Sequence, residues 1–421
     1  MTGSNFLRCV ALALALPTAA SAQLLPPVPQ LPQLPGRVRE AVGDLRGALP
    51  IDAAVDDARQ LARQSVARAR DLARRFPDRI ELDRDNNPVR AGEVTLADPD
   101  PALLALAQRA GFSVIASERY DDLGIGFARL RAPAGLSAVA AARVLGKIAG
   151  ADRVTLDPLY SASGEGMPSA GVREGVDPAS APGPGPGPKR IGIIDGGVSP
   201  GTPGLAAQQG FASGAPRASD HGMALASLLT GGGGIRTSAP GTALHVADVY
   251  GSDPAGGSAS ALARAIAWMV QTRVPVVVMS LAGPDNALLG RFVAAARARG
   301  TVIVAAVGNN GPAAPPAYPA SYPQAIAVTG VDGRGRVLVE AGRASHLDYA
   351  APGADMLALN AAGQAHGVRG TSFAAPLVAA RLSAVWGGDA AAAMKALDRE
   401  AKRGGRTGRG VLCQDCRTPA R

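Results

Sequence analysis

Aromatic residues and cysteines are scarce in this chain of 421 residues. Aromatic side chains make up 4% of it, three residues are cysteines and four are histidines, whereas 47% are hydrophobic. The length and the hydrophobic fraction allow a large core and more than one domain. The chain is therefore globular but poor in large side chains, and composition alone leaves its function open.

The few cysteines do not predict a metal or redox centre. Cys9 precedes an apolar leader segment, and Cys413 and Cys416 lie in a tail rich in arginine and glycine. A redox CxxC motif normally follows a strand at the start of a helix, and two ligands are too few for a zinc site. In an oxidising compartment these two cysteines can close a tight disulfide loop, so we expect them to be structural.

The excess of positive charge is confined to one half of the chain. The formal net charge is +9, residues 1–188 are balanced, and residues 395–421 contain eight basic against three acidic residues. No aromatic residues alternate with these charges and no nucleic-acid-binding motif is present. We therefore expect a solvated basic tail and no nucleic-acid partner.

The first residues, MTGSNFLRCVALALALPTAASAQ, are typical of a secretory signal peptide. Arg8 precedes an apolar run from Val10 to Leu16, and an A-x-A pattern ends at Ala22. The run is too short to span a bilayer, and no later segment predicts a membrane span. We expect a signal peptide over residues 1–22 and a secreted or periplasmic protein.

Two further patterns precede the main body of the chain. Residues 23–91 combine a proline-rich spacer, LLPPVPQLPQLPG, with one amphipathic helix predicted over 52–76, to which no role is assigned. Residues 92–160 predict the order strand, helix, strand, strand, helix, strand. This β-α-β-β-α-β order is that of a small α+β domain of the ferredoxin-like type. This fold alone does not indicate a function.

A linker and a larger domain follow. Residues 161–188 contain PGPGPGP and no hydrophobic period, which predicts a flexible linker. Over residues 189–421, helical stretches alternate with the apolar runs RIGIIDGG, ALHVADVY, VPVVVMSL, TVIVAAVG and AIAVTGV. This alternation predicts an α/β fold with a parallel sheet covered on both faces. Reactive groups in such folds gather at the carboxyl ends of the strands.

Four polar residues stand at the edges of these elements. Asp195 and Asn309 each follow a strand, and His221 opens a helical stretch. Ser372, in RGTSFAAP, precedes an apolar helical run, where the simplest interpretation is a helix N-cap. Each has an ordinary structural explanation when taken alone. Together they supply the nucleophile, base, orienting carboxylate and oxyanion donor that hydrolysis by serine needs.

The segments around these residues resemble the signature blocks of the subtilisin-like serine peptidases. The blocks are IIDGGV, HGMALASLLTG, AAVGNNG and GTSFAAP, and the chain order Asp, His, Ser is that of subtilisin. The resemblance covers about residues 189–386. It implies a subtilisin-like parallel sheet with helices on both faces. Residues 92–160 resemble the inhibitory propeptide of the same family.

The resemblance also implies roles for single residues. Ser372 would be the nucleophile, His221 the general base and then acid, and Asp195 the carboxylate that orients the imidazole. Asn309 and the Ser372 N–H would bind the oxyanion. The stretch that lines the primary pocket and pairs with an extended substrate matches Ser280, Leu281, Ala282 and Gly283. We expect an exported endopeptidase acting on proteins or peptides, with its own propeptide as intramolecular inhibitor.

Some residues depart from the family pattern. Gly196 follows Asp195 where Thr or Ser is usual, Met223 replaces a Thr, and Ala282 stands where Gly is common and narrows the pocket entrance. The loop TGGGGIRT lacks Asp and Asn, so it does not have the side-chain oxygen ligands of the family's tight calcium site. We therefore expect no metal and no cofactor. These glycines also lack the GK[ST] of a phosphate-binding loop.

Two alternatives and one processing site complete the expectations. A catalytically inactive relative, serving as a binding or chaperone protein, should lack at least one catalytic group, and none is missing. A hydrolase of the α/β-hydrolase fold should have G-x-S-x-G, which the GTSFA around Ser372 does not match. Self-cleavage is expected near Tyr160–Ser161, because an apolar pair there precedes small residues.

Overall fold

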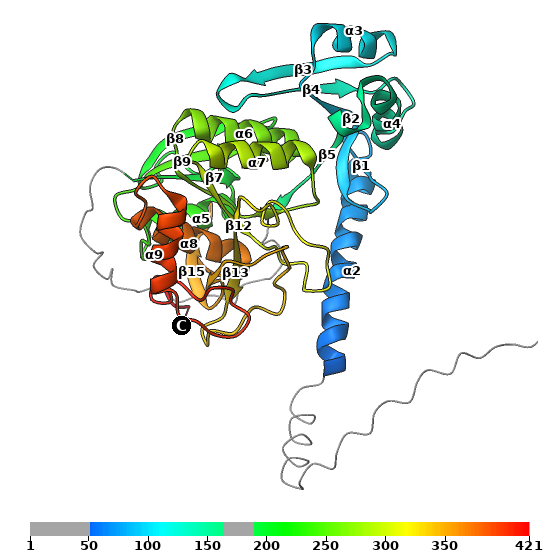
Figure 1. Ribbon diagram of the computed structural model, residues 1–421. Helices are drawn as coiled ribbons and strands as arrows, with labels where there is room; N and C mark the ends of the chain where they lie inside the picture. Colours follow the sequence, from blue (N-terminus) through cyan, green and yellow to red (C-terminus); the bar gives the residue numbers. More distant parts are fainter. Residues whose placement is uncertain (1–50, 163–188, 421) are drawn as a thin grey trace, which may run out of the picture. The chain divides into compact units, whose positions relative to one another are not determined.

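The computed structural model describes residues 51–162 and 189–420 (Figure 1). The predicted signal peptide, most of the proline-rich spacer and most of the linker over 161–188 lie outside the described residues. We call residues 51–162 the N-terminal domain and residues 189–420 the sheet domain. None of the helices in these two ranges is long and apolar enough to cross a membrane.

The N-terminal domain has the predicted β-α-β-β-α-β order, preceded by a long helix and a short strand. Strands β5 and β4 lie on either side of β2, and β3 pairs with β4, all antiparallel, while β1 pairs with the start of β2. The elements are α2 (Ile51–Arg75), β1 (Ile80–Leu82), β2 (Pro88–Ala97), α3 (Pro101–Arg109), β3 (Ser113–Tyr120), η1 (Asp121–Leu123), β4 (Ile125–Arg131), α4 (Ala138–Ala149), η2 (Ala151–Arg153), β5 (Val154–Pro158) and β6 (Ser161–Ala162).

Local sequence explains the two short helices of this domain. Asp100 accepts a hydrogen bond from the Leu103 N–H at 2.7 Å and is followed by a proline, which favours a helix start. Ser137 caps α4 in the same way. Both helices bury one apolar face on the sheet, where Leu96, Leu130 and other fully buried side chains form a core separate from that of the sheet domain.

The sheet domain contains a seven-stranded, fully parallel sheet with the strand order β14-β13-β12-β10-β7-β9-β8. The predicted α/β fold class is confirmed. The elements are β7 (Arg190–Asp195), β8 (Leu205–Gly210), α5 (Asp220–Thr230), β9 (Ala243–Asp248), α6 (Ala259–Gln271), β10 (Val276–Met279), β11 (Leu281–Ala282), α7 (Ala287–Ala298), β12 (Val302–Ala306), β13 (Ile326–Val331), β14 (Tyr349–Pro352), β15 (Met356–Leu359), β16 (Ala365–Val368), η3 (Thr371–Phe373), α8 (Ala374–Ala384) and α9 (Ala390–Glu400).

Alternate residues of each central strand face opposite cores. In β10, Val276 and Val278 pack with α5 and α8, whereas Val277 and Met279 pack with α6 and α7. Figure 1 shows α6 and α7 side by side on one face of the sheet. Because helices cover both faces of the sheet, its central strands are apolar throughout. Continuous apolar runs in the sequence therefore predicted them.

The C-terminal segment differs from the expected solvated tail. Leu397 of α9 and Leu412 are buried in the core beneath the sheet, and Val411 forms bridges with Ala350 and Lys402. Cys413 and Cys416 form the disulfide that their spacing allows. The basic residues Arg403, Arg406 and Arg409 are exposed, as expected, whereas the apolar residues that follow them are buried.

Candidate active site

A buried hydrogen bond joins Asp195 to His221. Asp195 is the last residue of β7, and His221 is the second residue of α5, whose N-cap is Ser219. The His221 Nδ1 lies 2.8 Å from the Asp195 Oδ1, which also accepts from the Gly196 N–H, and the two side chains are 8% and 1% exposed. A neutral imidazole that donates through Nδ1 carries its lone pair on Nε2, the atom that a general base uses.

Neighbouring side chains account for the two departures beside this pair. A Cβ on Gly196 would lie 2.1 Å from the Ser219 Oγ, so the cap of α5 occupies the space that a side chain would need. The Met223 Sδ accepts hydrogen bonds from the Ser199 N–H and the Thr202 hydroxyl, at 3.2 and 3.4 Å. Both departures therefore belong to local packing around the pair.

Ser372 lies in the short 3₁₀ turn η3, and α8 begins two residues later at Ala374. The N-cap of α8 is Phe373, and no side chain caps the helix. The prediction that Ser372 is the N-cap, or that the helix begins at this residue, is therefore wrong. Ser372 is fully buried in the described chain, and its carbonyl accepts from the Ser280 hydroxyl at 2.7 Å.

Asn309 follows β12 and is held by the residue before Ser372. The Thr371 N–H donates to the Asn309 Oδ1 at 3.0 Å, and the Thr371 hydroxyl donates to the Gly308 carbonyl at 3.1 Å. With its oxygen bound in this way, the carboxamide has its Nδ2 as the donor for another acceptor.

The structure brings the four predicted residues together. Asp195 contacts His221, and the His221 ring lies 5.5 Å from the ring of Phe373, the residue after Ser372. Asn309 is hydrogen-bonded to Thr371, the residue before Ser372. All lie beyond the carboxyl ends of β7 and β12 or at the start of α5 and α8, where a parallel sheet gathers its functional groups.

A strand from the N-terminal domain occupies the edge that was predicted to bind substrate. Strand β6 pairs antiparallel with β11, with Ser161 opposite Ala282 and Ala162 opposite Leu281. The next residue before β11 is Ser280, whose hydroxyl contacts Ser372. Of the four predicted substrate-lining residues, Leu281 and Ala282 pair with this segment, Ser280 is buried, and Gly283 pairs with Tyr318 instead.

Tyr160, which the sequence placed near the expected processing site, is a buried anchor between the two domains. Its ring lies against Gly283, where a Cβ would come within 2.5 Å, and its hydroxyl donates to the Pro284 carbonyl at 2.7 Å. Its N–H donates to the Gly257 carbonyl, and the Tyr250 hydroxyl donates to its carbonyl. Burial raises the pKa of the Tyr160 phenol well above its ordinary value, so the hydroxyl remains a donor.

The pairing of β6 with β11 bears on the cleavage expected near Tyr160–Ser161. From Ser161 to Ala162 the chain advances along β11 toward Ser280 and hence toward Ser372. The Tyr160–Ser161 bond lies at the far end of this pairing. Apolar character marked Tyr160 as a pocket residue, but only the register tells which pocket it fills.

Other residues of the N-terminal domain bind the starts of two helices of the sheet domain. The buried Asp157 carboxylate accepts from the Ser260 N–H and hydroxyl at 2.8 and 2.7 Å, in the first turn of α6. The N-cap of α7, Asn286, donates to the Leu156 carbonyl at 3.0 Å. A carboxylate at a helix start satisfies otherwise unpaired N–H groups and the positive end of the helix dipole.

The described residues contain no group of three or more His, Cys, Asp or Glu side chains that could hold a metal ion. The glycine loop at residues 231–234 is a tight turn in which every φ is positive, closed by a bridge between Gly232 and Ile235.

Known proteins resemble this chain in sequence and in structure. Residues 189–397 match the subtilase family. Subtilisin DY of Bacillus licheniformis is 32% identical over 215 residues, which cover 48% of this chain and 78% of that protein. A subtilisin of Bacillus pumilus is 31% identical over 204 residues, covering 45% and 74%.

Two solved structures share the fold. Fervidolysin from Fervidobacterium pennivorans, a keratinolytic enzyme related to subtilisin, matches with a TM-score of 0.64 and 17% identity over 80% of this chain and 62% of its own. The epidermin leader peptide processing serine protease of Staphylococcus aureus matches with a TM-score of 0.60 and 15% identity over 77% and 97%. Both matches extend beyond the sheet domain, so they include part of the N-terminal domain.

The sheet topology and these relatives define a hydrolase of the serine peptidase class. The chain belongs to the subtilase family and is a serine endopeptidase.

Proposed function

We propose that the chain hydrolyses peptide bonds through Asp195, His221 and Ser372. The Ser372 Oγ attacks the substrate carbonyl while the His221 Nε2 takes its proton, and Asp195 stabilises the resulting imidazolium. The protonated His221 then donates to the leaving amine, and an acyl-enzyme remains. Water activated by the same imidazole releases the acid. The observation that carries this assignment is the buried 2.8 Å contact between His221 and Asp195.

The oxyanion of the tetrahedral intermediate is bound by the Asn309 Nδ2 and the Ser372 N–H in this proposal. Support comes from the hydrogen bond that fixes the Asn309 oxygen on the Thr371 N–H. A donor that is already oriented stabilises developing charge without having to reorganise. Substrate adds as a strand to the edge formed by Leu281 and Ala282, the edge that β6 uses in this structure.

The N-terminal domain acts as an inhibitor that is part of the same chain. Three observations support this role: β6 covers the substrate edge, Tyr160 fills a buried recess beside it, and Asp157 caps α6. Strand β6 pairs with β11 in the way that a substrate would, and it therefore excludes other peptides from this edge. The protein is therefore made as a zymogen, and cleavage of its own chain beyond Ala162 starts activation. Its leader, residues 1–22, directs export.

A serine-directed fluorophosphonate probe tests the catalytic assignment. The processed wild-type enzyme should be labelled and should hydrolyse a casein substrate, whereas Ser372→Ala should do neither. Ser383→Ala is the matched control, because Ser383 is also buried, on α8, but lies outside the site; it should be labelled like the wild type. Labelling of Ser372→Ala at the wild-type level would refute the assignment.

A further inference from the structure

A cavity of about 340 Å³ lies between the N-terminal domain and the sheet domain. Arginines from both domains line it: Arg79, Arg90 and Arg129 from the first, and Arg264 of α6 from the second. Among the described residues that line it, Asp253 is the one acidic residue. Several water molecules or one small organic molecule would fit such a volume.

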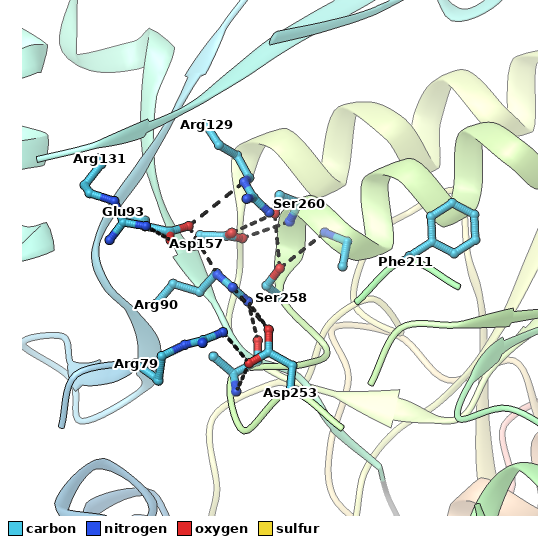
Figure 2. A network of polar contacts seen from close by, with 12 residues as sticks. Arg79, Arg90, Glu93, Arg129, Arg131, Asp157, Phe211, Asp253, Ser258 and Ser260 are labelled. Atoms are coloured by element: carbon cyan, nitrogen blue, oxygen red, sulfur yellow. Dashed lines mark hydrogen bonds and ion pairs between the residues drawn. The ribbon is translucent and has the colours of Figure 1, made fainter. Parts of the chain in front are cut away.

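The positive charge around this cavity exceeds the negative charge. Asp253 accepts from Arg79 at 2.7 Å and from Arg90 at 3.2 Å, so one carboxylate serves two guanidinium groups (Figure 2). The surrounding network adds Arg131, Glu93 and Asp157, which makes five arginines against three carboxylates in the part of the chain that the structure describes. Asp157 is already engaged by the start of α6.

The guanidinium of Arg90 keeps its charge in this setting. Burial alone would lower its pKa, but the carboxylates of Asp157, Glu93 and Asp253 raise the pKa above its ordinary value. Relief of the positive excess by loss of a proton is therefore excluded, since arginine is not deprotonated in proteins.

Two of the arginines have donors that the described chain does not satisfy. The Nε atoms of Arg129 and Arg264 are buried and have no hydrogen-bond acceptor among the described residues. The nearest carboxylate oxygen to the Arg129 Nε is that of Glu93 at 4.0 Å, which is too long for a hydrogen bond. Arg264 donates through Nη2 to the Phe211 carbonyl and lies over the Phe211 ring. A buried donor without an acceptor is costly, so these two guanidinium groups are incompletely compensated by the described residues around them.

We propose that this cavity binds a small polyvalent oxyanion of the phosphate or sulfate type. Such an anion offers several oxygens to guanidinium forks, which bind phosphate and carboxylate groups bidentately. It would offset the excess of positive charge that the four lining arginines bring to the cavity. This site is separate from the active site, and it does not depend on the proposed catalytic roles.

The position of the cavity gives the anion a consequence for the whole chain. Arg129 lies on β4 of the N-terminal domain and Arg264 on α6 of the sheet domain. An anion bound by both Arg129 and Arg264 would link the two domains and stabilise the uncleaved precursor. After the N-terminal domain leaves, only Arg264 of the four arginines remains, so the site exists in the precursor alone.

Titration of inorganic phosphate into the full-length Ser372→Ala chain tests the proposal. Calorimetry in a chloride buffer of matched ionic strength should detect one saturable site, and phosphate should raise the unfolding midpoint, because a ligand that binds only the folded state stabilises it. Sulfate should act similarly and monovalent acetate much less. Arg129→Gln and Arg264→Gln should each weaken binding about tenfold or more, the effect of losing a charge-assisted contact.

Arg291→Gln is the matched control. Arg291 also joins the two domains, through Asp98 at 2.6 Å, but it does not line the cavity. This variant should bind phosphate as tightly as its parent. Arg264→Lys, which keeps the charge but loses the fork, should fall between Arg264→Gln and the parent. The absence of a saturable site in the parent, or equal binding in all variants, would overturn the proposal.

Discussion

At the scale of single residues, the site depends on hydrogen bonds that orient its side chains. Asp195 fixes the tautomer of His221, and the Thr371 N–H fixes the carboxamide of Asn309. The sequence could propose Asp195, His221, Asn309 and Ser372 as candidates because each stands in a distinctive block beside an apolar run. It marked Tyr160 only as an apolar residue near the processing site, because the contacts of Tyr160 are with glycines about a hundred residues away.

Asn309→Ala should lower kcat with little change in KM, because the lost donor acts on charge that develops after substrate binds. The expected loss is about 100- to 1,000-fold, the effect known for removal of one such donor in subtilisin. Steady-state kinetics with a chromogenic peptide measures it. Asn310→Ala, at the neighbouring position, is the control and should keep kcat near the wild-type value. An Asn309→Ala enzyme with wild-type kcat would remove Asn309 from the oxyanion site.

At the scale of elements, apolar periodicity predicted the central strands and the helices that cover them. The edge strand β8, LAAQQG, was missed because two glutamines interrupt its apolar pattern and none of its residues is fully buried. Strand β6 has two residues and no pattern of its own. It exists because β11 pairs with it, more than a hundred residues further along the chain. Local sequence therefore could not predict the element that covers the proposed substrate edge.

Gly283→Ala should loosen the attachment of the N-terminal domain. The added methyl group would lie 2.5 Å from the Tyr160 ring, and overpacking of this kind costs about 1–3 kcal/mol. In the Ser372→Ala background, the substitution should make the N-terminal domain easier to remove by an added protease. Gly387→Ala is the control, since a Cβ there meets nothing within 4 Å. Equal resistance of the two variants would argue against Tyr160 as the anchor.

At the scale of the whole molecule, polar contacts hold the two domains against each other. Asp98 and Arg291 form one such pair. Burial tends to raise the pKa of Asp98, but the Gly126 N–H and the Arg291 guanidinium lower it below its ordinary value. A carboxyl group whose folded pKa is lowered stabilises the fold above its unfolded pKa of about 3.9, and this contribution is lost as the pH falls through the folded value.

The Asp98–Arg291 pair should therefore stabilise the precursor at neutral pH and lose this effect in acid. With Ser372→Ala as parent, Asp98→Asn should lower the unfolding midpoint slightly at pH 7, since a half-exposed pair contributes about 0–1 kcal/mol. The difference from the parent should begin to shrink as the pH falls below about 4 and should vanish below the lowered folded pKa of Asp98. A difference that is unchanged in acid would show that the Asp98 charge is not its source.

Our central proposal is that this subtilase is made as a precursor and cuts its own chain with Ser372 while its N-terminal domain occupies the proposed substrate edge. Mass spectrometry of the purified chain, with N-terminal sequencing of the products, tests it most directly. The wild type should divide into two fragments, the larger beginning beyond Ala162, and Ser372→Ala should remain whole. Division of both proteins at the same bond, or a wild-type fragment that begins at Ser161, would contradict the account.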